Sequence, residues 1–170
     1  MDDLPFHEIP SPPAAPRATT IMARVVDGLG FRYRWATEGL RPQDEDFRPG
    51  PDSMTLRELL HHVARLTAWL DSHAGGPPMT DLARDVPSLR AATLSRLHAL
   101  RTRLVAMPDA ELAALSITGT PERGPLPFWN MLNGPLADAL THVGQVNAWR
   151  RLAGNPPPRA DVFRGRPPGA

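Results

Sequence analysis

The strongest helical pattern in the chain lies in residues 56–70, which read LRELLHHVARLTAWL. Its apolar side chains recur at the spacing of one helix face: Leu56, Leu59, Leu60, Val63, Leu66 and Leu70. This spacing is typical of an amphipathic helix that buries one side against other helices. At about 100° per residue, His61 falls nearly opposite the apolar stripe, whereas His62 falls on its flank, roughly 90° away. We expect His61 to face water and His62 to line a space between helices.

A second helix of interest is indicated by residues 135–154. Asn133-Gly134-Pro135 is typical of a helix start, and Gly154 followed by three prolines is typical of an end. Its predicted core stripe is Leu136, Ala139, Leu140, Val143 and Val146. Asp138 and His142 are four residues apart, so their side chains lie one above the other on the helix. A carboxylate and an imidazole therefore point toward one spot.

Two further helices complete the predicted fold. Residues 19–38 begin at an N-cap, Thr19 or Thr20, and carry an apolar side formed by Ile21, Met22, Val25, Val26, Leu29, Tyr33 and Ala36. Gly28 and Gly30 interrupt this helix and suggest the close approach of a neighbouring helix. Another helix begins near Ser88 and ends at Pro108-Asp109, and residues 110–115 add a short turn. With no convincing strand, the sequence predicts an all-α, up-down four-helix bundle.

Proline-rich segments flank this bundle. We expect residues 1–18 to form an extended arm, residues 19–154 the helical bundle, and residues 155–170 a proline- and arginine-rich tail. The tail should be ordered only if other parts of the chain hold it. Residues 117–127 are rich in glycine and proline and predict a loop.

Composition excludes several classes of protein. A chain of 170 residues and 18.6 kDa suits one domain with a real core. The sequence contains no cysteine and no lysine, which excludes thiolate catalysis, cysteine metal sites and Schiff-base chemistry. A net charge of +1 gives no large basic field, so we expect no nucleic-acid partner. The start resembles no signal peptide and no apolar run could span a membrane, so we expect a cytoplasmic protein with no membrane partner.

A metal site is the main functional hypothesis from the residues themselves. His62 and His142 each lie about 90° from the apolar stripe of their helix, and such flanks can converge in a bundle. Two imidazoles with the carboxylate of Asp138 suit zinc, nickel, iron or manganese, and leave open positions for water or substrate. Alternatively, Asp138 is a solvated charge near the helix start, where it interacts favourably with the helix dipole.

Several neighbours have two possible roles each. Glu58 lies on the same side of its helix as His62, and is a fourth ligand, an orienting carboxylate or a surface residue. Trp69 and Trp149 either wall a pocket or pack in the core. Three amides either hydrogen-bond a bound group or act as caps: Asn130, Asn133 and Gln145. Arg150 and Arg151 are explained by the helix dipole, with anion binding as the weaker alternative.

Four motifs resemble the DinB/YfiT-like superfamily. Residues 58–64 (ELLHHVA) resemble its second-helix motif, and residues 140–145 (LTHVGQ), with Arg151 and Gly154, resemble its closing motif. Residues 26–33 (VDGLGFRY) and 128–135 (FWNMLNGP) look like one branch of uncharacterised DinB-like proteins. Together the motifs cover roughly residues 19–154.

The resemblance implies a four-helix bundle, frequently a homodimer, with a divalent metal between the second and last helices. Its usual ligands carry over to His62 and His142, while the first histidine of the family's HxxxH pair is replaced by Asp138. Relatives include thiol-cofactor-dependent transferases and isomerases and metal-dependent hydrolases.

Two functions follow as expectations. The first is a metal-dependent hydrolase or thiol transferase acting on a small molecule, with a metal-activated water or thiol as nucleophile. The second is a metal-free, non-catalytic dimeric bundle that serves as a binding or structural protein.

Overall fold

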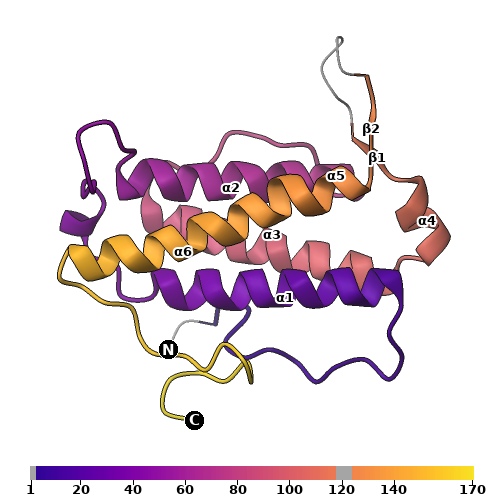
Figure 1. Ribbon diagram of the computed structural model, residues 1–170, viewed down its shortest axis with the longest axis horizontal. Helices are drawn as coiled ribbons and strands as arrows, with labels where there is room; N and C mark the ends of the chain where they lie inside the picture. The colour runs from indigo at the N-terminus through magenta and orange to yellow at the C-terminus, as the bar shows by residue number, and fades with distance from the viewer. Residues whose placement is uncertain (1–2, 118–123) are drawn as a thin grey trace.

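Four long helices form the body of the protein. The computed structural model describes residues 3–117 and 124–170. The long helices lie alongside one another (Figure 1) and are α1 (Ala18–Thr37), α2 (Leu56–His73), α3 (Val86–Ala106) and α6 (Ala137–Leu152). The shorter elements are a 3-10 turn (Pro42–Asp44), α4 (Asp109–Ala114), strands β1 (Ser116–Ile117) and β2 (Leu126–Pro127), α5 (Trp129–Met131) and a π-helical turn (Leu132–Leu136). The predicted all-α class is confirmed. The expectation of no strand is wrong for one short antiparallel pair. Its strands lie at the two ends of the predicted loop of residues 117–127, part of which falls outside the described residues.

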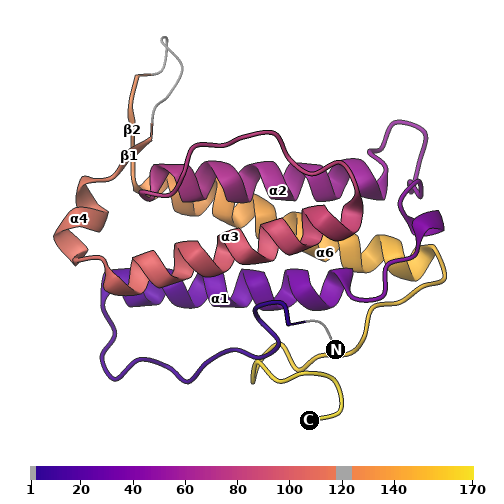
Figure 2. The ribbon, with the colours of Figure 1, turned by 180° about the vertical axis from the view of Figure 1, so that it is seen from behind.

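Two consecutive long helices, α2 and α3, run in the same direction (Figures 1 and 2), whereas an up-down bundle would have them antiparallel. α1 and α2 each pack against both α3 and α6. Figures 1 and 2 show α2 and α3 running in the same direction, because the segment between them returns along the length of α2. The 18 residues of α2 span about 27 Å, and residues 74–85 can reach roughly 40 Å when extended. The connection is thus long enough to cross back, and an up-down order is not confirmed.

Polar side chains cap the starts of α2 and α3. Thr55 and Glu58 form a capping box at the start of α2, with the Thr55 N–H donating to Glu58 Oε2 at 2.7 Å. Asp85 caps α3 by accepting from the Ser88 N–H at 2.8 Å. The prediction for α1 was wrong, because its N-cap is Arg17. The backbone N–H and hydroxyl of Thr19 instead donate to the carboxylate of Asp109, which α4 brings from far along the chain.

The core contains most of the predicted apolar positions. All the predicted core residues of α2 except the half-buried Leu66 are buried, as are Leu136, Ala139, Val143 and Val146 at the other end of the chain. Leu140 is only partly buried. On α1, Ile21 is 58% exposed and Val25 is 37% exposed, so the predicted apolar side is wrong at these two positions. Within the described residues, no helix combines the length and the apolar character needed to cross a membrane.

The N-terminal arm packs against α1 at Gly30, Arg34 and Trp35. The ring of Phe6 packs so closely on Gly30 that a Cβ atom there would lie 2.6 Å from it. The close approach predicted at Gly30 is therefore made by the arm rather than by a helix. Arg34 donates to the carbonyl oxygen of Leu4 at 2.5 Å, and Trp35 Nε1 donates to that of His7 at 3.2 Å. These contacts explain why α1 is buried on two sides.

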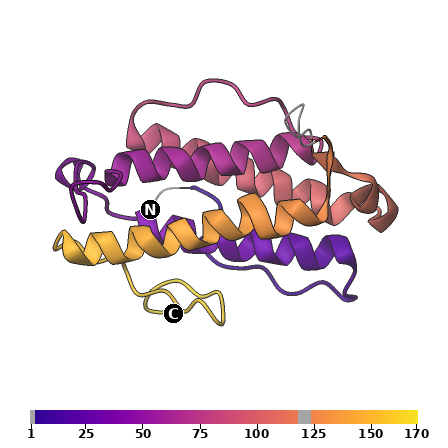
Figure 3. The ribbon, with the colours of Figure 1, turned by 45° about the horizontal axis from the view of Figure 1, so that its top comes forward.

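The C-terminal tail folds back beneath α1, next to the arm (Figures 1 and 3). The Ile9 N–H donates to the Gly165 carbonyl at 2.9 Å, which joins the arm to the tail. Asn155 donates to Asp44 Oδ2 at 2.6 Å and holds the beginning of the tail. Arg150 is buried and donates to three carbonyl oxygens at the end of α1, those of Ala36, Glu38 and Gly39. Arg150 therefore caps the C-terminal end of α1, in addition to any interaction with the dipole of α6, its own helix.

Candidate metal centre

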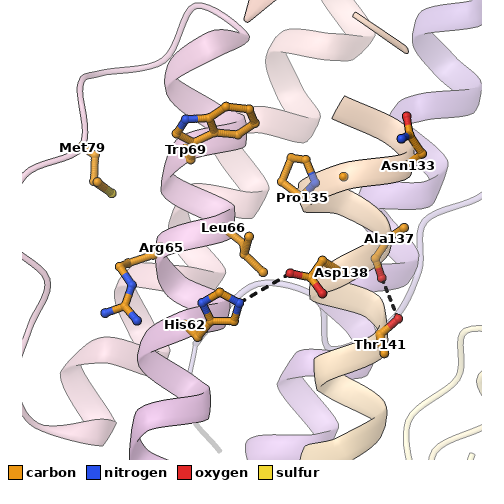
Figure 4. A pocket seen from close by; sticks show the side chains of 11 residues that line it. His62, Arg65, Leu66, Trp69, Met79, Asn133, Pro135, Ala137, Asp138 and Thr141 are labelled. Carbon is orange, nitrogen blue, oxygen red and sulfur yellow. Dashed lines mark hydrogen bonds and ion pairs between the residues drawn. The ribbon is translucent and has the colours of Figure 1, made fainter. Parts of the chain in front are cut away.

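Side chains of α2 and α6 meet at the predicted metal site. His62 projects from α2 toward Asp138 on α6 (Figure 4), and its Nε2 lies 3.5 Å from Asp138 Oδ2. One helical turn beyond Asp138, His142 Nε2 lies 3.2 Å from Oδ1 of the same carboxylate. The two imidazole rings are 4.7 Å apart between centroids and meet edge to face. The two helix flanks therefore converge as expected, because α2 and α6 pack against each other.

The spacing of these groups fits a single ion. Ligand atoms about 2.1 Å from a tetrahedral ion lie about 3.4 Å from one another, close to the separations of 3.5 Å and 3.2 Å given above. One ligand atom from each residue can be chosen so that all three lie within 4.8 Å of one another. The side chains are 27%, 47% and 16% exposed for His62, Asp138 and His142. The group is thus close enough to hold a metal and remains open to solvent.

Asp138 interacts with both imidazoles through different oxygens, so it is more than a solvated charge at the helix start. Gln145 also contributes, since its Oε1 lies 2.6 Å from Nδ1 of His142. The sequence left open whether this amide binds a ligand or is structural. In the structure it contacts Nδ1 of His142, while Nε2 of the same ring faces Asp138, so it fixes the orientation of the ring.

Glu58 does not join the site. It is exposed, and its carboxylate accepts from the backbone N–H and hydroxyl of Thr55. These hydrogen bonds lower the pKa of Glu58 below its usual value. The possibilities that Glu58 is a fourth ligand or orients His62 are therefore wrong, because it caps α2.

A groove of about 670 Å³ opens beside the candidate metal group. Its walls come from α2, the segment after α2, and the start of α6, and include Leu66, Trp69, Met79 and Pro135 (Figure 4). His62 and Asp138 lie along it, and Asn133 contributes an amide. Trp69 lines the groove and also packs against the core, so both interpretations hold for it. Trp149 packs against the core and does not line the groove.

Some groove residues carried no signal in the sequence. Met79 lies in a proline-rich connection whose path depends on the whole fold, and Pro135 was interpreted only as part of a helix start. The regular helix α6 begins at Ala137, after a π-helical turn in which Gly134 has the non-helical angles φ −94° and ψ −111°. Such turns often occur at functional sites. Here the irregular turn forms one wall of the groove.

The other histidines make separate contacts. His61, which we expected to face water, is partly exposed. His73 Nδ1 lies 2.9 Å from the Trp69 carbonyl oxygen, and His98 meets the Phe6 ring edge to face. His7 packs against Trp35. Across the described residues, the cluster with metal-ligand spacing is His62, Asp138 and His142.

No protein-family model matches this chain, and no curated protein matches it at a significant level. The resemblance to the DinB/YfiT-like superfamily therefore rests on the sequence motifs alone.

Proposed function

We propose that the chain is a DinB/YfiT-like metal-dependent enzyme in which a divalent ion binds between α2 and α6. The observation that carries this proposal is the meeting of His62, Asp138 and His142 at ligand spacing beside a groove. Two imidazoles and one carboxylate suit zinc, nickel, iron or manganese. Three protein ligands leave a coordination position free for a small molecule.

The residues that line the groove indicate what the protein itself would contribute to the proposed reaction. A bound divalent ion lowers the pKa of a coordinated water or thiol and so supplies a nucleophile at neutral pH. Apart from His62 and Asp138, the ionisable residue among those lining the groove is Arg65, whose guanidinium is a poor base. The nucleophile therefore has to be activated at the ligand group, without a separate base from the groove walls. Leu66, Trp69 and Pro135 would hold an apolar part of the substrate next to it.

The finer fold assignment belongs to the same proposal. We assign the four long helices to a DinB/YfiT-like bundle, with α2 and α3 in the same direction, flanked by an N-terminal arm and a C-terminal tail. The resemblance also implies a homodimer. Ile21 and Val25, both exposed on α1, supply apolar surface that a second copy could cover.

Metal analysis tests this proposal directly. Protein purified without a histidine tag is stripped with a chelator, then equilibrated separately with Zn²⁺, Ni²⁺, Mn²⁺ and anaerobic Fe²⁺. We expect one ion per chain for at least one metal, lost in His62→Ala and in His142→Ala but kept in His61→Ala. Folded protein that takes up none of the four metals would contradict the proposal and favour a metal-free binding or structural bundle.

Reaction class is tested on the metal-loaded protein. Thermal unfolding is followed with and without low-molecular-weight thiols. A rise in Tm that requires both the metal and the thiol supports thiol transfer. No rise with any thiol tested would contradict thiol transfer and favour hydrolysis by an activated water.

A further inference from the structure

A second hollow, of about 330 Å³, lies where the C-terminal tail crosses α1 and α6. Arg32 and Trp35 of α1 form part of its wall, and Arg151 of α6 and Arg159 of the tail form another part. The metal groove has its walls on α2 and the start of α6 and shares none of these residues. The hollow is therefore a separate feature of the fold.

Three arginines line this hollow, and no acidic residue does. Arg32 donates to the carbonyl oxygen of Gly28 at 3.2 Å, and Arg151 donates to that of Asn147 at 2.9 Å. Each of these bonds uses one N–H of a group that has five, so both keep donors for another partner. Elsewhere the chain pairs arginines with carboxylates, as in Arg41 with Asp44. At the hollow, the positive charges have no such partner among the described residues.

The nearest acidic residue of the tail is already engaged. Asp161 Oδ1 accepts from the backbone N–H groups of Phe163 and Arg164, both at 3.0 Å. Its other oxygen lies 3.8 Å from the guanidinium of Arg164. Asp161 therefore does not neutralise the three arginines of the hollow.

The tail is held in place, which makes the hollow a fixed site. Pro157 is buried beneath it, and Ala160 packs against the core. The bridge between Asp161 and Arg166 and the bond from Ile9 to Gly165 fasten the turn that follows. Arginines of α1, α6 and the tail thus line one hollow because the tail folds back over the two helices.

We propose that this hollow binds a phosphate group, either inorganic or carried by a small organic molecule. Guanidinium donors match phosphate oxygens in pairs, and a phosphate monoester carries enough negative charge to balance two arginines. A volume near the lower end of the range for small-molecule sites leaves room for a small body beside the phosphate. Trp35 and Pro157 supply apolar surface for that body.

Calorimetric titration of metal-stripped protein, after removal of the chelator, tests this site independently of the metal group. The probes are inorganic phosphate, pyrophosphate and glucose 6-phosphate at constant ionic strength. We expect one saturable site with Kd below about 1 mM for at least one probe. Arg32→Gln and Arg151→Gln combined should raise Kd roughly tenfold or more, while Arg65→Gln combined with Arg164→Gln, with the same charge change, should alter it by less than about twofold.

The probes also separate the two sources of phosphate. Tighter binding of glucose 6-phosphate than of the inorganic ions indicates that an organic body is bound, and the reverse order indicates inorganic phosphate or pyrophosphate. Arg159→Gln, at an exposed tail position, weakens binding without a change in Tm if the site is correct. Absence of binding below about 1 mM by all three probes, or equal weakening in the control variant, would overturn the site.

Discussion

Nδ1 of His142 lies 2.6 Å from Oε1 of Gln145, on the side of the ring away from Asp138. An amide oxygen only accepts hydrogen bonds, so in this orientation of the Gln145 side chain the bond is donated by Nδ1 of His142. In the neutral ring, Nε2 then presents its lone pair to Asp138 Oδ1 at 3.2 Å. Two electron-rich atoms at that distance repel each other unless a cation lies between them. Gln145 thus leaves Nε2 of His142 free to bind a metal ion.

Replacing Gln145 should therefore weaken metal binding. In Gln145→Ala we expect the metal Kd to rise about tenfold to a hundredfold, because the imidazole loses the acceptor that sets its tautomer and orientation. Gln145→Glu keeps an oxygen acceptor at the same place and should retain the affinity. The Kd is measured by competition with a coloured chelator. Equal weakening in both variants would show that the amide oxygen has no such role.

The packing of Phe6 on Gly30 predicts a stability effect. Gly30→Ala would place a Cβ atom 2.6 Å from the Phe6 ring, so we expect a loss of about 1–3 kcal/mol in the free energy of unfolding. Gly144 provides the control, because it lies on α6 with no neighbouring atom within 4 Å of an added Cβ. Gly144→Ala should stabilise the helix by up to about 1 kcal/mol.

A double variant identifies the cause. Because Phe6→Ala removes the obstacle, Gly30→Ala made in that background should cost little or be stabilising. Urea unfolding of the four proteins measures the coupling. The same cost of Gly30→Ala with and without Phe6 would contradict the arm as its source.

Asp44 predicts a dependence of stability on pH. Burial alone would raise the pKa of Asp44, but hydrogen bonds from Arg41 and Asn155 outweigh it and lower the pKa to about 2, from a usual 3.8. The folded state therefore favours the ionised carboxylate. This stabilisation is complete above the unfolded pKa and is lost as the pH falls toward the folded value.

The matched variant is Asp44→Asn. We expect it to be less stable than the parent protein by roughly 1–2 kcal/mol at pH 7, with the difference shrinking between about pH 5 and pH 2. Urea midpoints across this pH range provide the measurement. A difference that stays constant with pH would mean that the charge of Asp44 does not stabilise the fold.

Burial predicts how α2 and α6 respond to truncation. Leu59 is 1% exposed, so Leu59→Ala should cost about 2–5 kcal/mol. Leu140 is only partly buried and should cost less. His61→Ala should change the free energy of unfolding by no more than about 0.5 kcal/mol. A loss for His61→Ala as large as that for Leu59→Ala would require a different rotation of α2.

Local helix geometry explains which features the sequence could predict. The spacing of Asp138 and His142 is set by the helix itself, and the flank position of His62 follows from the apolar stripe of α2. Both could therefore be inferred without a tertiary structure. The predicted start of α3 near Ser88 also lies close to the observed start at Val86.

Features that depend on distant segments could not be inferred in this way. The cap that Asp109 provides for α1, the burial of Phe6 against Gly30 and the capping of α1 by Arg150 all join residues far apart in the chain. Exposure of Ile21 and Val25 has the same origin, since the arm covers another side of α1. The groove also depends on the path of the segment that carries Met79.

Anomalous diffraction from crystals of the metal-loaded protein, collected at the absorption edge of the bound metal, tests the central claim most directly. We predict one peak within about 2.3 Å of Nε2 of His62, Nε2 of His142 and a carboxylate oxygen of Asp138. No peak at this position, or a peak at His61 or His73 in its place, would contradict a metal centre between α2 and α6.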